Sequence, residues 1–268
     1  MCRVLQVSRS GYYGWKHREL SARSKRREAV KVEVKTLFGE YKKRYGAIRL
    51  ARELNAKGIC CSLNYVASLL REEGLKARNG KRFKYTKSGS SKTNIQANVL
   101  GRDFSAVRPN EKWVTDITYI FVNGKWLYLA AVMDLCSRRI VGWSLDTHMT
   151  NTLIINAFDM ALSRRKITTR LLVHSDQGVQ YRSHEYQQKL LSYGCHLSMS
   201  RKGNCWDNAA MESFFSRLKV ELIYAEQLKN FAQAKLLIFE YIEVFYNRIR
   251  RHSAIGYVSP MQFEQQFL

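Results

Sequence analysis

The sequence has no long apolar run, no zinc-type cysteine spacing and few acidic residues for its length of 268. No stretch approaches the roughly 20 apolar residues that a membrane-spanning helix needs. The opening residues also lack the apolar core of a signal peptide. The six cysteines form no C-x-x-C pair and show no zinc-ligand spacing with histidine. We therefore expect a soluble, cytoplasmic protein with free thiols and no membrane partner.

The charge balance points to a polyanionic partner. The 22 Asp and Glu residues face 45 Lys and Arg, a net charge of +23, which most simply indicates nucleic acid. The surplus is uneven, because residues 1–92 hold 24 basic and 7 acidic side chains while residues 93–268 hold 21 and 15. This predicts an N-terminal DNA-binding module joined to a second module with a different function. The alternative is a generally basic, solvated surface.

The first third of the chain has apolar residues at helical spacing. Val30, Val34 and Leu37 share one helical face, and Gly58 and Gly74 predict the ends of two further helices. Three short helices with a glycine turn before the last predict a helix-turn-helix, with a plain helical bundle as the alternative. We assign residues 1–87 to this helical region, in which the expected phosphate contacts are Arg71, Lys76 and Arg78.

The second part of the chain changes period. Residues 88–107 have no periodicity and predict a linker. From Trp113 the apolar period is two, and Asn123-Gly124 predicts a hairpin turn. The resulting order, β-β-β-α-β-α-β-α over residues 108–222, predicts an α/β fold with a mixed five-stranded sheet and helices. A long amphipathic helix over 229–252 would form most of a C-terminal helical extension, 223–268.

Three acidic residues fall on different elements of this expected fold. Asp116 lies inside a strand with apolar residues on both faces, where an unpaired charge is costly; the alternative is that it sits on a solvated face. Asp176 directly follows a strand, which is also ordinary turn chemistry. Glu212 lies near the start of a helix that Asp207 or Asn208 is expected to cap, and a helix start favours an acid by itself. Converging, these carboxylates would form an oxygen-rich site for divalent metal.

Basic and polar side chains accompany the acids. Asn208, Glu212 and Lys219 are spaced to share one helical face, so a carboxylate and a cation would lie along one stripe. Arg201 and Lys202 precede this helix and are expected to line a DNA path, although a solvated loop explains them equally well. We predict DNA contacts for Lys219, Arg201, Lys202 and Asn208.

With these residues placed, the chain resembles the OrfB-type transposases of bacterial insertion sequences, which belong to the retroviral-integrase-like superfamily. The resemblance spans nearly the whole chain. Its most specific pieces are SRKGNCWDNAAMESFFSRLKVE and YNRIRRHSAIGYVSP, with VSRSGYYGW, YGAIRLARELNAKG, WVTDITYI and HSDQGVQY in support. The family's D, D-35-E pattern falls on Asp116, Asp176 and Glu212, and its basic residue seven positions later falls on Lys219.

The resemblance implies a ribonuclease H-like fold for about 108–222 and a DNA transposase that nicks donor strands and transfers them. The three acids would hold two Mg²⁺ ions, with Mn²⁺ as a substitute. Expected partners are the double-stranded DNA of the element ends and target, further copies of the chain, and an upstream OrfA segment as a fusion partner. The protein would be nucleoid-associated when bound to DNA. The alternatives are a non-catalytic repressor derived from a transposase and a nuclease without strand transfer.

Overall fold

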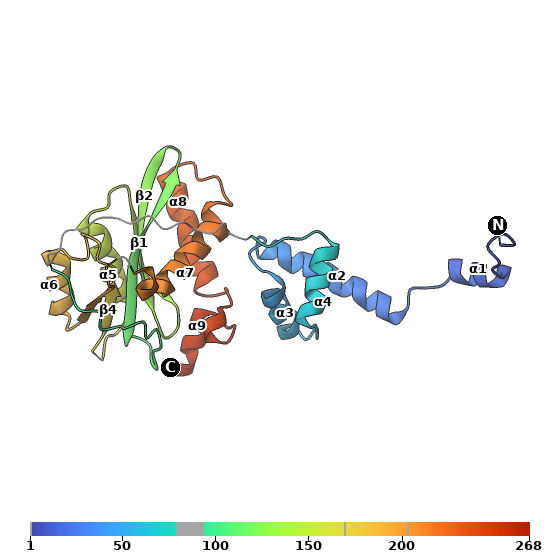
Figure 1. Cartoon of the computed structure of the whole chain (residues 1–268), viewed down its shortest axis with the longest axis horizontal. Helices are drawn as coiled ribbons and strands as arrows, with labels where there is room; N and C mark the ends of the chain where they lie inside the picture. The colour runs from blue at the N-terminus through green and yellow to red at the C-terminus, as the bar shows by residue number, and fades with distance from the viewer. Residues whose placement is uncertain (1, 79–93, 169, 203) are drawn as a thin grey trace. The chain divides into compact units, whose positions relative to one another are not determined.

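The computed structural model describes residues 2–78, 94–168, 170–202 and 204–268, which form two compact units, residues 2–78 and the described residues from 94 onward. The predicted boundary between residues 87 and 88 lies outside the described residues. Figure 1 shows helices alone in the first unit and a sheet with helices in the second. Within the described residues, no helix is both long and apolar enough to cross a lipid bilayer.

The first unit contains the helices that the apolar spacing predicts. They are α1 (Arg9–Lys16), α2 (Ala22–Glu40), α3 (Ala47–Ala56) and α4 (Leu63–Glu72). Helices α2, α3 and α4 bury Leu37, Leu50 and Leu69 between them, whereas α1 buries no residue. Helix α4 begins directly after Ser62, whose side chain caps it by accepting a hydrogen bond from Tyr65 N–H.

The second unit is built on a mixed five-stranded sheet, as predicted. Its strands are β1 (Lys112–Val122), β2 (Lys125–Asp134), β3 (Ile140–Asp146), β4 (Leu172–Ser175) and β5 (His196–Met199), in the order β3-β2-β1-β4-β5. Strands β1, β2 and β3 are antiparallel neighbours, and β4 and β5 run parallel to β1. The Asn123-Gly124 turn joins β1 to β2 with both residues at positive φ, as its composition predicts.

Helices cover both faces of this sheet. Figure 1 shows α5 (Asn151–Arg164) and α6 (His184–Ser192) on one face, and α7 (Ala209–Leu218), α8 (Phe231–Phe239) and α9 (Pro260–Glu264) on the other. Helix α5 packs closely on β3 at Gly142, where an added Cβ would stand 2.1 Å from the carbonyl oxygen of Ala157. Only glycine allows this approach.

The C-terminal extension differs from the single long α-helix expected over 229–252. After α8 the backbone widens into π-helix over Glu240–Tyr246, and α7 is likewise followed by a π-helical turn over Lys219–Ile223. A buried ion pair joins the two π-helical regions: Arg250 donates to both carboxylate oxygens of Glu221, and the Tyr241 hydroxyl donates to the same carboxylate.

The extension also covers the outer edge of β3. The Asn247 side chain accepts a hydrogen bond from Ile140 N–H at 3.0 Å and donates one to Ile140 C=O at 2.9 Å. The Asn247 side-chain amide thus makes the two hydrogen bonds to Ile140 that a neighbouring strand would otherwise make. Glu264 on α9 adds ion pairs to Arg139 and Arg165 beside this edge.

Residues 94–107, expected to belong to a linker, instead pack on the α/β unit. Leu100 is buried, Met199 N–H of β5 donates to Ala97 C=O at 3.2 Å, and Val99 N–H donates to the Ser198 hydroxyl at 2.9 Å. This segment therefore covers the edge of the sheet at β5.

Candidate active site

Asp116 lies on the central strand β1, on the face that meets α7. It is half-buried, and its carboxylate accepts a hydrogen bond at 2.8 Å from the N–H of the next residue, Ile117. The flanking residues Val114 and Thr115 are fully buried. Asp116 is thus fixed in backbone position by the best-packed part of the sheet.

Asp176 emerges from the carboxyl end of β4, the parallel neighbour of β1. The register pairs Val114 with His174, so Asp176 lies level with Asp116 along the sheet. Its Oδ1 accepts a hydrogen bond from Gly178 N–H at 2.8 Å, and a Cβ on Gly178 would stand 2.9 Å from that oxygen. The turn therefore orients the carboxylate, and a larger residue at Gly178 would displace it.

Glu212 lies on α7, which packs against β1, the strand that carries Asp116. The first turn of α7 is tied to the sheet by Asn208, whose Nδ2 donates to Thr115 C=O at 3.1 Å. Asn208 is buried, and its Oδ1 meets no hydrogen-bond donor among the described residues. Asn208 thus ties the start of the Glu212 helix to the strand that carries Asp116, and the DNA contact predicted for it stays a prediction.

The electrostatics show that the three acids and Lys219 are near neighbours. Burial, together with repulsion from Asp176 and Glu212, raises the pKa of Asp116 well above its usual range, against attraction by Lys219. Burial also raises the pKa of the Asp176 and Glu212 carboxyls, although both residues remain exposed at the mouth of the site. Burial lowers the pKa of Lys219, and Asp116 opposes this.

These residues suit a hard divalent cation in kind. Carboxylate oxygens are the ligands that such ions take, and a cation would relieve the repulsion that Asp116 experiences. In the described part of the chain, however, no three His, Cys, Asp or Glu side chains stand where they could jointly hold an ion. The acids approach one another without forming a finished cage, and exposed Glu212 is free of the tight packing that fixes Asp116.

His174, which the sequence did not single out, fixes the end of β4. The Ser198 hydroxyl accepts hydrogen bonds from two N–H groups of the 94–107 segment, so its own proton is left for His174 Nδ1 at 2.8 Å. His174 Nε2 therefore carries the ring proton and donates at 3.1 Å to Ser200, which donates to Ser175 C=O. Burial lowers the pKa of His174 to about 4, so the ring is neutral at pH 7.

Asp207 was expected as a helix cap, but it serves as an anchor. Its fully buried carboxylate accepts bonds from Arg201 N–H, Nε and Nη2, from Arg102 Nε and from Asn98 Nδ2, and no side-chain cap bond begins α7. The Arg201 guanidinium holds the pKa of this carboxyl well below its usual range. Asp207 thus joins the 94–107 segment, the loop after β5 and the start of the Glu212 helix.

The other predicted DNA contacts fall on both units. Arg201 pairs with Asp207 but keeps 58% of its side chain exposed, and Lys202 beside it is exposed. Arg71 and Lys76 are exposed and Arg78 is half-buried, all three in the helical unit.

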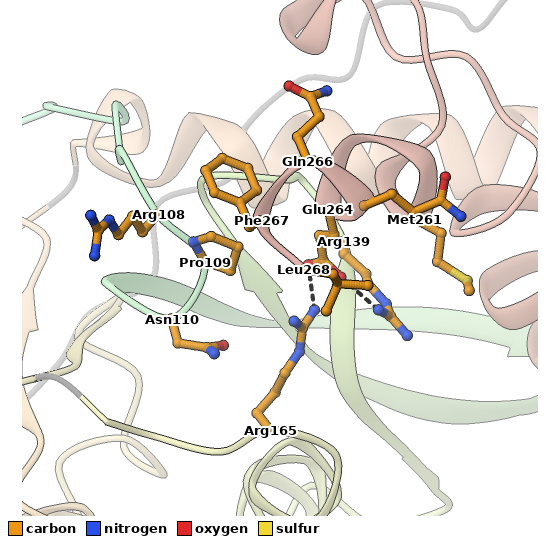
Figure 2. Close-up of a pocket in the computed structure, with 11 residues that line it drawn as sticks. Arg108, Pro109, Asn110, Arg139, Arg165, Met261, Glu264, Gln266, Phe267 and Leu268 are labelled. Carbon is orange, nitrogen blue, oxygen red and sulfur yellow. Dashed lines mark hydrogen bonds and ion pairs between the residues drawn. The ribbon is translucent and has the colours of Figure 1, made fainter.

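A separate hollow lies at the other end of the sheet, where β1 and β3 begin. Figure 2 shows Arg139 and Arg165 converging there on Glu264, with Arg108 and Phe267 on the rim. None of the three acids lines it. The charged side chains of this hollow pair largely with one another, so the hollow is not the candidate active site.

Comparisons with known proteins identify the family of both units. Integrase core domain models match residues 106–205 and 212–268, and an HTH-like domain model matches residues 25–83. The chain is 44% identical to the transposase InsF for insertion sequence IS3A of Escherichia coli (strain K12), over all of this chain and 94% of that protein. It is 39% identical to an uncharacterized 31 kDa protein of insertion element IS600 from Shigella sonnei, over all of this chain and 98% of that protein.

A solved structure shares the fold. The simian T-cell lymphotropic virus intasome, in complex with PP2A regulatory subunit B56 gamma, matches with a TM-score of 0.51 at 15% identity, over 87% of this chain and 74% of that one. With the strand order above, this confirms the predicted ribonuclease H-like, integrase-type fold. The chain therefore belongs to the insertion-sequence transposases that combine an HTH-like domain with an integrase core.

Proposed function

We propose that this chain carries out metal-dependent nicking and strand transfer of DNA at the ends of an insertion sequence. The observation that supports this most directly is the convergence of Asp116, Asp176 and Glu212 from three elements, close enough for their charges to repel at Asp116. Strained, like-charged carboxylates are typical of sites built for a cation or a proton transfer.

The three carboxylates would hold two Mg²⁺ ions, or Mn²⁺ as a substitute. When bound, such ions supply activation of an attacking hydroxyl and stabilisation of a leaving oxygen on phosphorus. The attacking group is water in nicking and a DNA 3′-hydroxyl in strand transfer. Asp116 is held by packing and Asp176 by its turn, whereas exposed Glu212 completes the site by moving toward them.

Basic residues would position the DNA. Asp116 attracts Lys219, and this supports a role in which the Lys219 ammonium would pair with a phosphate next to the cut. Lys202 and the exposed side of Arg201 extend the path. In the helical unit, Arg71, Lys76 and Arg78 would contact the phosphates of the terminal repeats. Joining two DNA ends calls for several copies of the chain, with an OrfA segment as a candidate fusion partner.

The test is cleavage of labelled element-end DNA by the wild type, by Glu212→Gln and by a matched control, Glu185→Gln. Glu185 is an exposed acid in the first turn of α6, as Glu212 is in α7. We expect Glu212→Gln to lose about a thousandfold in nicking rate while it keeps DNA binding, since metal-ion catalysis contributes several kcal/mol. Glu185→Gln should act as the wild type, and EDTA should abolish activity of both.

Equal cleavage by both variants would refute the acidic site. A wild type that binds element ends tightly without cutting them in Mg²⁺ or Mn²⁺ would favour the second candidate, a repressor that occupies the terminal repeats. The large positive charge and the HTH-like domain are compatible with that function. Products that are cut but never joined would instead indicate a nuclease.

A further inference from the structure

The tip of the β1–β2 hairpin carries exposed aromatic rings on one face only. Tyr119, Phe121 and Trp126 are 47%, 56% and 53% exposed, whereas Ile120 and Leu127, on the opposite face, are buried. Such alternation is ordinary at the surface of a protein when the outer side chains are polar. Here they are large aromatic rings, an arrangement that usually marks a contact site.

These rings form one continuous strip. The register places Tyr119 opposite Tyr128 and Phe121 opposite Trp126. Neighbouring ring centroids are 5.0 to 6.3 Å apart, with Tyr119 edge-on to both Trp126 and Tyr128. Edge-to-face packing holds each ring in place, so the strip is preformed.

The strip lies close to the candidate active site but on the other face of β1, because Tyr119 and Phe121 point away from the face that carries Asp116. Strand β4 ends at Ser175, level with Thr115 of β1, so β1 continues alone on this side for seven residues, and Figure 1 shows the hairpin extending past α5 and α6. Asp176 stands at the base of this extension. Burial raises the pKa of Tyr119, and the charges of Tyr128, Asp176 and Asp116 add to this, so its hydroxyl lies within electrostatic reach of both acids past the end of β4.

We propose that the strip of Tyr119, Phe121 and Trp126 is a stacking platform for unpaired nucleobases of the DNA strand that enters the acidic site. The inference rests on the proposed function, since it takes DNA as the substrate of that site.

The composition of the strip favours nucleobases over a protein partner. Its members are all aromatic, and the exposed Lys125 lies at the adjoining turn, where it pairs with Val122 on the other face of the hairpin. Exposed aromatic rings with a basic side chain nearby can bind single strands, because each base offers a π-face and each nucleotide a phosphate. Stacking is tolerant of sequence, which suits an enzyme that joins one DNA end to many targets.

Base unpairing next to the cut has a chemical reason. A phosphodiester inside a stacked duplex is held away from side chains that must surround it, and enzymes commonly release nucleotides from the stack to reach them. Rings close to the site would receive the released bases and hold the strand open.

The experiment uses the full chain carrying Glu212→Gln, so that DNA is bound and not cut. The probe is element-end DNA with a four-nucleotide single-stranded overhang that carries 2-aminopurine at one position at a time, with a blunt duplex as a second probe. In this background Tyr119, Phe121 and Trp126 are each replaced by leucine. Tyr224→Leu is the matched control, since Tyr224 is 69% exposed in the same unit and belongs to the segment between α7 and α8 instead of the hairpin.

We expect each strip variant to bind the overhang about tenfold more weakly, the amount that one stacked base contributes. Quenching of 2-aminopurine at one or two positions should disappear in the same variants. Blunt-duplex affinity and the Tyr224→Leu control should not change.

Unchanged affinity and quenching in all three variants would overturn the proposal. So would equal losses for the overhang and the blunt duplex, which indicate a general duplex contact. A change of oligomeric state by light scattering with DNA affinity intact would show that the strip binds another protein copy. Because binding is measured without cleavage, failure of the acidic-site mechanism would leave this result readable.

Discussion

Replacing Asn247 by leucine tests how the C-terminal extension is held to the sheet. The wild-type amide satisfies both Ile140 N–H and Ile140 C=O, and the side chain is only 1% exposed. Leucine fills nearly the same volume but offers no polar atom. Both backbone groups of Ile140 then lose their partners, and water has no path to replace them.

The destabilisation follows from the backbone N–H and C=O of Ile140, which both lose their hydrogen-bond partner. A buried backbone group left without a hydrogen bond costs about 1–3 kcal/mol, so the pair predicts a loss of about 2–6 kcal/mol in the free energy of unfolding. Asn247→Asp should do no better at pH 7, because it keeps an acceptor for the N–H but sets a second, charged oxygen against the Ile140 carbonyl.

Urea unfolding followed by tryptophan fluorescence measures this loss. Four of the five tryptophans lie in the α/β unit, at positions 113, 126, 143 and 206, so the signal reports mainly that unit. Asn156→Leu is the matched control, since Asn156 is exposed on α5. A loss below about 1 kcal/mol for Asn247→Leu, or the same loss in the control, would refute the reasoning, because it would mean that the edge is satisfied in another way.

Three further changes test the packing. Gly142→Ala should destabilise by about 3 kcal/mol and lower Tm, because its Cβ would collide with the carbonyl of Ala157; an unchanged Tm would contradict the close approach. Arg250→Met should cost about 3–5 kcal/mol by leaving Glu221 buried and unpaired, and adding Glu221→Leu should recover most of that loss; a double variant no more stable than the single one in thermal melts would disprove this. His174 stays neutral down to about pH 4 in the folded protein, whereas an unfolded histidine is protonated near pH 6.5. The free energy of unfolding of the wild type should therefore fall by about 3 kcal/mol as the pH falls through this window. His174→Asn should lack this pH dependence when urea midpoints are measured.

The strands could be predicted from the sequence, and the acids could be selected from it as candidates, because the signals for both are local. Alternation sets β1, the Asn123-Gly124 turn sets the hairpin, and an aspartate inside an apolar strand is costly enough to suggest a function. Helix ends set by Gly58 and Gly74 were predictable for the same reason, since both have positive φ.

What could not be predicted depends on partners far away in the chain. The Asp207 carboxylate meets Asn98 and Arg102, more than 100 positions before it, so in sequence it was indistinguishable from a helix cap. Asn208 shares a helical face with Glu212, but its burial against Thr115 depends on where α7 meets β1. The π-helical region after α8 likewise could not be recognised from the spacing of the apolar residues.

The two guarded edges of the sheet have a consequence for behaviour at high local concentration. An outer strand with open N–H and C=O groups is a template onto which a neighbouring chain can add itself and start aggregation. Here an amide from residue 247 occupies one edge, and the 94–107 segment lies along the other. Copies crowded on one stretch of DNA can therefore remain separate folded molecules. A truncation that removes residue 247 or the 94–107 segment should make the protein insoluble before it reduces catalytic activity.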